Sequence, residues 1–234
     1  MAEQRSESTK VKVCGVTRLH DAELAASLGA WAVGMIFYEP SPRRCSLEQA
    51  QTISQALRRN VQLAGVFVNE SLSQIARIAE ELQLSIVQLH GDETAEVVSR
   101  MRRSIRVIKA IRVRESFHVA ELANFKGASS ILLDGFDAQL RGGTGKSFNW
   151  KLAKSAGRKR QIFLAGGLTP ENAAEAVSAA RPFAIDVCSG VETRPGKKDV
   201  ARMRALVAAV RPLAERRAAS KTRGVSPTRR KRRS

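Results

Sequence analysis

Short, nearly continuous apolar runs alternate with amphipathic stretches along most of the chain. Apolar runs without polar alternation are typical of strands that are buried on both faces of a parallel sheet. Eight such runs are expected to form strands, at residues 11–14, 32–37, 63–68, 86–89, 107–111, 130–133, 162–164 and 184–187. Buried parallel strands require crossover connections that cover the sheet, and helices usually supply them.

The stretches between these strands carry helical signatures. Residues 46–57 open with the capping-box spacing of Ser46 and Gln49, and residues 71–82 open with the same spacing. Eight strand–helix units in series predict a single-domain α/β fold, the (β/α)8 or TIM barrel. An open doubly wound sheet is the alternative, but the GxGxxG fingerprint that normally follows its first strand is missing after Gly15.

Half of the net positive charge lies at the C-terminal end. The 234 residues include 40 Lys+Arg and 22 Asp+Glu, a formal net charge of +18, and residues 211–234 hold ten bases and one acid. We expect a flexible N-terminus at 1–9, the barrel at 10–212 and a disordered basic tail at 213–234. A nucleic-acid-binding arm is the alternative, but no aromatic residue interleaves the charges, so we expect no nucleic-acid partner.

Composition excludes several other classes of protein. With 43% hydrophobic residues the chain can bury a core, and no apolar run approaches the ~18 residues of a membrane span. The polar N-terminus carries no secretory signal, and three cysteines without CxxC spacing predict neither a disulfide scaffold nor a zinc site. We expect a cytoplasmic monomer without a membrane partner, a metal or a cofactor.

Glycines follow two neighbouring strands at the end where such a barrel has its active site. Gly166 and Gly167 follow the seventh strand, and Ser189 and Gly190 follow the eighth. The loops after these strands commonly form a phosphate site, because glycine lets backbone N–H groups approach the phosphate closely. Tight turns alone would explain either pair, but the two together favour a phosphate site.

Two ionisable groups end the first and sixth strands and can face each other across the barrel mouth. Cys14 is a competent base once its pKa is lowered, for which Lys12 is a candidate neighbour. Asp134 ends an apolar strand abruptly. A buried small cysteine and a turn-capping aspartate are the alternatives, but a base with an acid is what acid–base isomerisation requires. Arg43 can bind a carboxylate bidentately, with a solvated surface arginine as the alternative. His90 can serve in catalysis or contact a substrate, with a structural histidine as the alternative.

Taken together, the motifs resemble those of the phosphoribosylanthranilate isomerase family, in order and over roughly residues 10–210. They are KVCGVT at 12–17, FYEPSPR at 37–43, GVFVN at 65–69, VQLHGDE at 87–93, LLD at 132–134, GGTGK at 142–146, AGGLTPEN at 165–172, DVCSGVE at 186–192 and PGKKD at 195–199. Each motif alone is weak, but this many in series are highly specific.

The resemblance implies the third step of tryptophan biosynthesis, an aldose–ketose isomerisation. N-(5-phosphoribosyl)anthranilate undergoes an Amadori rearrangement to 1-(2-carboxyphenylamino)-1-deoxyribulose 5-phosphate, without metal or cofactor. By position the resemblance implies Cys14 as general base, Asp134 as general acid, Arg43 as the carboxylate-binding residue and residues 142–145 as a mobile lid. We expect the substrate-binding residues to be Arg43, His90, Gly143, Gly166, Gly167, Asp186, Ser189 and Gly190.

The chain departs from the family pattern at Asn149, where Asp is usual, at Cys188, where Ser is common, and in its basic tail. One alternative is another phosphosugar barrel enzyme. A histidine-pathway isomerase needs an aspartate where Cys14 stands, and indole-glycerol-phosphate synthase needs a longer N-terminal helix. The other alternative is a nucleic-acid-binding protein on an inactive barrel, against which Cys14, Asp134 and Arg43 argue.

Overall fold

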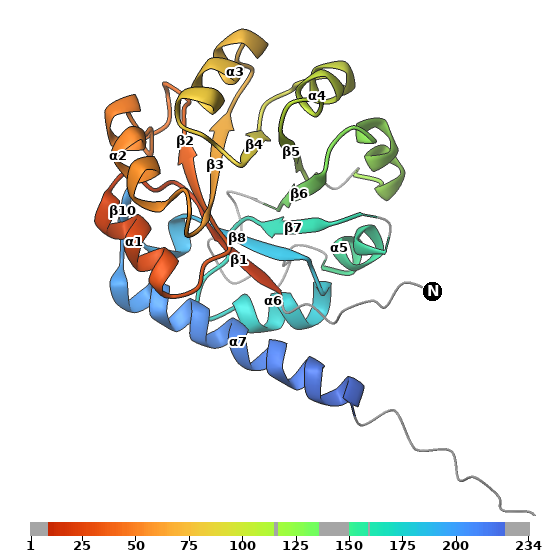
Figure 1. Ribbon diagram of the computed structural model, residues 1–234. Coiled ribbons are helices and arrows are strands. Elements are labelled where there is room, and N and C mark those ends of the chain that lie inside the picture. Colours follow the sequence, from red (N-terminus) through yellow and green to blue (C-terminus); the bar gives the residue numbers. More distant parts are fainter. Residues whose placement is uncertain (1–8, 115–116, 136–149, 159, 223–234) are drawn as a thin grey trace, which may run out of the picture.

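Eight parallel strands close into a barrel in which they follow one another in sequence order. The structure, a computed structural model, describes residues 9–114, 117–135, 150–158 and 160–222. Figure 1 shows the helices arranged around the barrel, which confirms the predicted (β/α)8 fold. The strands are β1 (Lys10–Val13), β2 (Ala32–Ile36), β3 (Gln62–Phe67), β4 (Ile86–Leu89), β5 (Arg106–Arg112), β6 (Ser130–Asp134), β7 (Ile162–Ala165) and β8 (Ala184–Val187).

Helices connect the strands and cover the outside of the barrel (Figure 1). The α-helices are α1 (Leu19–Ser27), α2 (Leu47–Leu57), α3 (Leu72–Glu81), α4 (Ala95–Met101), α5 (Trp150–Gly157), α6 (Ala173–Ala180) and α7 (Val200–Thr222). A 3-10 helix, Val119–Phe125, takes the place of an α-helix between β5 and β6. After β8 come a short 3-10 helix, Ser189–Val191, and a hairpin formed by β9 (Glu192–Arg194) and β10 (Lys197–Lys198).

Ser46 at the start of α2 and Ser71 at the start of α3 both cap their helices with the side chain, as predicted, but only α2 has the full capping box. The Ser46 hydroxyl accepts from Gln49 N at 3.2 Å while the Gln49 side chain accepts from Ser46 N at 3.0 Å. At α3 the Ser71 hydroxyl accepts from Gln74 N at 3.3 Å, but Ser71 N donates to Glu70 instead. The nearer carboxylate of Glu70 thus replaces the reciprocal bond.

Helix α7 extends further than the sequence pattern indicated. It runs to Thr222, ten residues beyond residue 212, where the barrel was expected to end and disorder to begin. The added segment is rich in Ala, Arg and Lys, which favour helix even without an apolar stripe. Within the described part of the chain, no helix is both long and apolar enough to cross a membrane.

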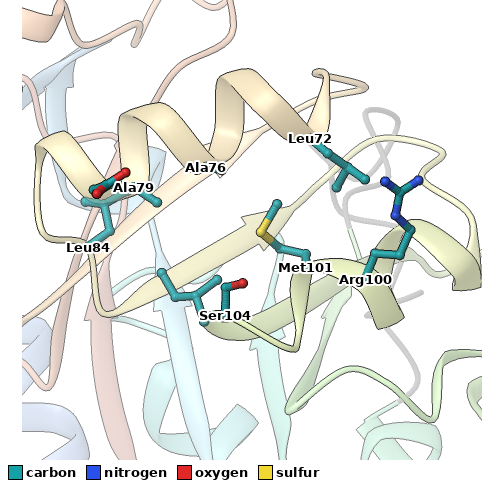
Figure 2. Close-up of a pocket in the computed structure, with 9 residues that line it drawn as sticks. Leu72, Ala76, Ala79, Leu84, Arg100, Met101 and Ser104 are labelled. Atoms are coloured by element: carbon teal, nitrogen blue, oxygen red, sulfur yellow. The ribbon is translucent and has the colours of Figure 1, made fainter.

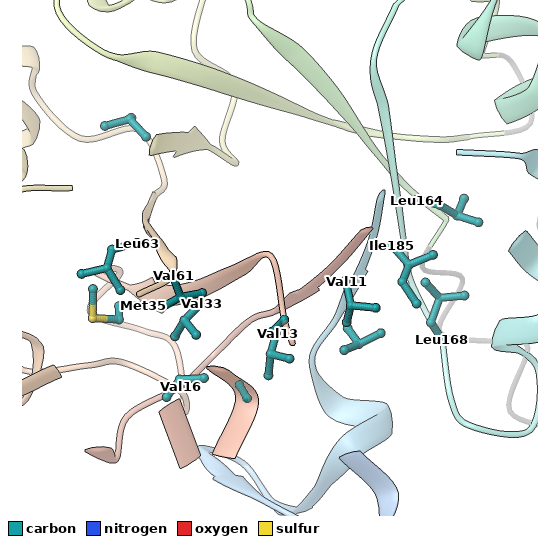
Figure 3. Packing of buried hydrophobic residues seen from close by; sticks show 14 of the residues in the cluster. Val11, Val13, Val16, Val33, Met35, Val61, Leu63, Leu164, Leu168 and Ile185 are labelled. Carbon is teal, nitrogen blue, oxygen red and sulfur yellow. The ribbon is translucent and has the colours of Figure 1, made fainter. Parts of the chain in front are cut away.

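Alternate residues of each strand face two different cores. The outward side chains pack under the helices in a large apolar cluster, and Figure 3 shows part of it around Val11, Val33 and Leu164. The inward apolar side chains form a separate layer that lies mostly low in the barrel, with Ala165 level with Asp134. Its members are Ala64, Ile86, Ile108, Ala110, Leu132, Phe163, Ala165 and Ala184. Trp31 and Phe183 pack against this layer, with their ring centroids 5.6 and 5.5 Å from that of Phe163.

The strand register decides which polar side chains meet above that layer. Lys12 on β1 pairs with Asp186 on β8, and Arg112 on β5 pairs with Asp134 on β6. On β4, β6 and β8, going two residues along the strand leads from an apolar inward residue to a polar one, as from Ile86 to Gln88. The barrel therefore places its polar interior groups at the carboxyl ends of the strands.

Candidate active site

Cys14 follows β1 directly, at the carboxyl end of the barrel. Its backbone N–H donates to the Val187 carbonyl at 2.8 Å, which continues the β1–β8 pairing by one residue. The residue is 6% exposed. On the neighbouring strand, a Cβ at Gly34 would lie 2.9 Å from Cys14 Sγ and 3.0 Å from Lys12 Nζ. The absence of a side chain at Gly34 therefore leaves room for the thiol and the ammonium group.

Lys12 places an ammonium group in the barrel interior below Cys14. It is fully buried, and its Nζ donates to both carboxylate oxygens of Asp186, at 2.9 and 3.0 Å. Asp186, expected to bind substrate, is itself only 7% exposed. Because a buried charge without a partner costs several kcal/mol, each member of this pair keeps the other in the interior.

The surroundings of Cys14 keep it in the thiol form. Burial raises the pKa of Cys14, the negative charge of Asp186 adds to this, and the charge and hydrogen bond of Lys12 lower it without outweighing burial. Burial also acts to lower the pKa of Lys12, but that pKa is raised overall, chiefly by the negative charge of Asp186 and its hydrogen bond with Lys12. Lys12 thus stays protonated beside a thiol, and the lowered pKa that a resting thiolate would need is not found.

Asp134 ends β6 and is joined by hydrogen bonds to β4. His90 Nε2 lies 3.2 Å from Asp134 Oδ2, and Gln88 Nε2 lies 2.9 Å from His90 Nδ1. In this orientation the Gln88 amide nitrogen donates to Nδ1, so Nε2 carries the hydrogen that His90 donates to Asp134. His90 and Asp134 both act electrostatically on Asp186. Asp134 and His90 therefore lie near the Lys12–Asp186 pair.

Sequence reasoning missed Gln88, which lay inside the apolar run 86–89. It is fully buried, and its Oε1 has no hydrogen-bond partner among the described residues. An unpaired buried amide oxygen costs roughly 1–3 kcal/mol, so stability alone does not account for this residue. Its signal in the sequence is a polar residue at an inward position two residues before His90.

A second buried ion pair shapes the loop that carries His90. Lys109 Nζ lies 2.7 Å from Glu93 Oε2 and donates to the Gly91 carbonyl at 2.6 Å. Glu93 in turn accepts from the backbone N–H groups of Gly91 and Asn69, the latter at 2.9 Å. This pair holds the ends of β3, β4 and β5 together, and sequence reasoning did not identify it.

Arg43 lies across the end of β1 and is held from one side by Glu192. Its Nε donates to both carboxylate oxygens of Glu192, at 3.1 and 2.9 Å. A Cβ at Gly15, whose φ is +67°, would lie 2.9 Å from Arg43 Cδ and 2.7 Å from Cys188 Sγ. Gly15 thus lets Arg43 cross directly beside Cys14. Cys188, one of the departures from the family pattern, lies in the same cluster, and burial raises its pKa to about 12.

The two loop segments expected to bind phosphate, Gly166–Gly167 and Ser189–Gly190, are neighbours in space. Gly166 and Gly167 have φ values of 93° and 61°, the left-handed region that favours glycine, and a Cβ on Gly167 would meet nothing within 4 Å. Ser189 and Gly190 belong to the 3-10 helix after β8. A Cβ on Gly190 would collide with the Leu168 carbonyl oxygen, so the missing side chain lets the two loops touch.

Among the described residues, one cavity adjoins the ends of β4 and β5, and another lies on the outside of the barrel. A cavity of about 360 Å³ is lined by His90, Lys109 and Arg112, beside the barrel mouth. A cavity of about 570 Å³ lies between α3 and α4 on the outside of the barrel, lined by Leu72 and Met101 among others (Figure 2). The outer cavity holds none of the expected site residues.

The structure brings the expected acid, the expected base and the expected substrate-binding residues to one barrel mouth, with Gly143 as the exception. Gly143 and the expected lid at 142–145 lie outside the described residues. Within the described ranges, no group of three or more His, Cys, Asp and Glu side chains is arranged to hold a metal ion.

The fold and this site define a (β/α)8 barrel with an acid, a cysteine and glycine-rich loops at the carboxyl ends of its strands. Residues 11–209 match the family model of N-(5'phosphoribosyl)anthranilate (PRA) isomerase. The chain therefore belongs to the phosphoribosylanthranilate isomerase family, and it is an isomerase of tryptophan biosynthesis, as the motifs predicted.

Relatives and solved structures agree with this assignment. An N-(5'-phosphoribosyl)anthranilate isomerase of Citrifermentans bemidjiense is 45% identical over 206 residues, covering 88% of this chain and 98% of the relative. The crystal structure of the Thermotoga maritima enzyme has a TM-score of 0.80 at 41% identity, covering 87% and 99%. A crystal structure of the isomerase in complex with reduced 1-(o-carboxyphenylamino)-1-deoxyribulose 5-phosphate has a TM-score of 0.78 at 39% identity, with the same coverage.

Proposed function

We propose that this chain converts N-(5-phosphoribosyl)anthranilate into 1-(2-carboxyphenylamino)-1-deoxyribulose 5-phosphate, with Asp134 as general acid and Cys14 as general base. The observation that carries the proposal is that Asp134 ends β6 and Cys14 directly follows β1, so both stand at the carboxyl ends of strands of the same barrel. An acid and a base at one mouth are what a proton transfer between neighbouring carbons requires.

In the first step Asp134 protonates the ring oxygen of the ribose. The bond between this oxygen and C1 breaks, its electrons stay on the oxygen, and the lone pair of the aryl nitrogen forms a C1–N iminium. Asp134 becomes a carboxylate, which the N–H of His90 at 3.2 Å stabilises.

In the second step the Cys14 thiolate removes the proton from C2. The C–H electrons form the C1–C2 double bond, and the iminium electrons return to nitrogen, which gives an enolamine. The Asp134 carboxylate then takes the C2 hydroxyl proton and the Cys14 thiol gives its proton to C1. These transfers give the ketone and return Asp134 to its acid form and Cys14 to the thiolate, whose own proton passed to solvent before the second step. Because the iminium is a cation beside Cys14, the first step lowers the pKa that burial raises in the resting thiol.

Binding groups lie on either side of this reaction centre. Arg43, with its Nε on Glu192, offers its remaining N–H groups to the anthranilate carboxylate. Gly166, Gly167 and Gly190 offer backbone to the phosphate, and Ser189 adds a hydroxyl. We further propose that the enzyme acts in the cytoplasm and as a monomer, with these residues gathered at the mouth of a single barrel.

The test follows the fluorescent phosphoribosylanthranilate, generated in situ, as the protein consumes it. Wild type is expected to consume it, and Asp134→Asn to lose most of this turnover while staying folded. Asp92→Asn is the matched control, because Asp92 is an exposed aspartate at the end of β4. No consumption by wild type would contradict the proposed substrate, and near-normal kcat in Asp134→Asn would contradict the acid.

A further inference from the structure

We propose that Glu192 is a positioning residue that sets the selectivity of the site for a carboxylate, by holding Arg43 through Nε and leaving its two Nη atoms to bind the substrate. This inference rests on the proposed function, in which Arg43 binds the anthranilate carboxylate. Glu192 lies 149 residues from Arg43 in sequence, in the hairpin of β9 and β10.

The geometry of the contact is one-sided. Both carboxylate oxygens of Glu192 accept from Arg43 Nε, at 3.1 and 2.9 Å, and the Nη atoms have no hydrogen-bond partner among the described residues. A guanidinium is planar and rigid, so fixing it at Nε fixes the direction of the Nη pair as well. That pair is the fork that matches the two oxygens of a carboxylate.

Burial distinguishes this ion pair from an ordinary surface contact. The Glu192 side chain is 3% exposed, while that of Arg43 is 23% exposed. By contrast, the neighbouring Arg44 pairs with Glu39 with both side chains more than half exposed. An exposed pair contributes little and moves freely, whereas a buried carboxylate can act as a fixed anchor for the exposed end of its partner.

A negative anchor beside a carboxylate site would repel the substrate unless its charge were balanced. Lys198 supplies the balance: its Nζ lies 2.8 Å from Glu192 Oε1 and is fully buried. The Gly196 N–H donates to the same oxygen at 3.3 Å. Lys198, Glu192 and Arg43 together carry one net positive charge, and that charge is placed on the exposed guanidinium.

The hairpin that carries Glu192 is tied to the strand ends around Cys14. Thr17 donates its hydroxyl to the Gly196 carbonyl at 2.8 Å, and Lys198 N donates to the buried Asp21 at 3.1 Å. These hydrogen bonds join the hairpin to the loop after β1 and to α1 as one unit. Arg43, crossing over Gly15, is held against this unit and so at a fixed place beside Cys14.

The test measures KM and kcat for phosphoribosylanthranilate in Glu192→Gln, Arg43→Ala and the double variant. Glu192→Gln removes the charge at nearly constant shape. It is expected to raise KM about tenfold with kcat within about threefold of wild type, since fixing a carboxylate contact is uniform binding. The double variant is expected to have the KM of Arg43→Ala alone, because Glu192 acts through Arg43. Glu39→Gln is the matched control and should leave both constants unchanged.

Three results would overturn the inference while leaving the proposed function intact. They are an unchanged KM in Glu192→Gln, a fall in kcat equal to the fall in kcat/KM, and a double variant whose losses add in full. If Glu192→Gln does not fold, Glu192→Asp replaces it, since this change keeps the charge and withdraws it from Nε by one methylene. Glu192→Asp must then show the same rise in KM. Failure of wild type to consume the substrate would instead contradict the proposed function.

Discussion

The two ends of the barrel interior are built from the same strands but from opposite kinds of residue. Low in the barrel most inward positions are apolar, as at Ile86 on β4 and Leu132 on β6. Two residues further along the same strands stand Gln88 and Asp134. Burial of the lower layer stabilises the fold, whereas burial of the polar groups in the upper layer away from water destabilises it. The residues that stabilise the barrel and the residues expected to carry out the reaction therefore lie about two positions apart on the same strand.

The sharpest test of the upper layer is Cys14→Ser. A hydroxyl is a far weaker base than a thiolate, so kcat is expected to fall by about 10²–10⁴, while the unfolding midpoint stays near that of wild type. Steady-state kinetics with thermal unfolding measures both. A variant that kept wild-type turnover would show that Cys14 is only a buried small side chain.

Lys12→Met tests whether the upper layer also supports the fold. The change leaves Asp186 buried without its partner, so we expect a loss of about 3–5 kcal/mol in the free energy of unfolding, as large as that of a cavity in the lower layer. Urea unfolding measures it, with Lys154→Met on α5 as a control in a helix on the outside of the barrel. A loss under about 1 kcal/mol would mean that Asp186 is neutral or hydrated without Lys12.

The pH dependence tests the state of Cys14. Since burial raises its pKa despite Lys12, the active thiolate is the minor form near neutral pH. Its fraction rises with pH below that pKa, so in an Asp134→Asn background, which carries no titrating acid at this position, the residual kcat/KM is expected to increase by up to about tenfold per pH unit between pH 6 and 8. A profile that is flat over this range would mean that Cys14 is already a thiolate.

The same slope is expected for alkylation of Cys14 by iodoacetamide, measured in a Cys45→Ala/Cys188→Ser background. Removing these two cysteines isolates the signal, because burial raises the pKa of both to about 12 and they would add a steep reaction of their own at high pH. A rate of alkylation that does not depend on pH would contradict the thiol assignment independently of the substrate.

The smallest effect is expected from removing the end of the basic tail. A chain of residues 1–222 keeps the whole matched region, 11–209, and the whole of α7. Its kcat and KM are expected to stay within about twofold of wild type. A larger loss of activity would show that residues 223–234 contribute to catalysis.

The sequence predicted the barrel and the strand-end residues because both follow from local patterns. Apolar runs gave the strands, and residues such as Cys14 and Asp134 stood out where those runs end. Contacts between distant segments left no such signal: the Lys12–Asp186 pair depends on the β1–β8 register, and the Arg43–Glu192 pair joins two loops. Gln88 was hidden because a single inward polar residue does not break an apolar run.

The most direct test of the division between the two ends compares neighbours on β6, Leu132→Ala and Asp134→Asn. For each, the free energy of unfolding and the kcat for phosphoribosylanthranilate are measured on folded protein. Leu132→Ala is expected to lose about 2–5 kcal/mol of stability and to keep kcat, whereas Asp134→Asn is expected to keep its stability and lose about 10²–10⁴ in kcat. Equal losses of kcat in both variants, or full turnover in Asp134→Asn, would contradict the account.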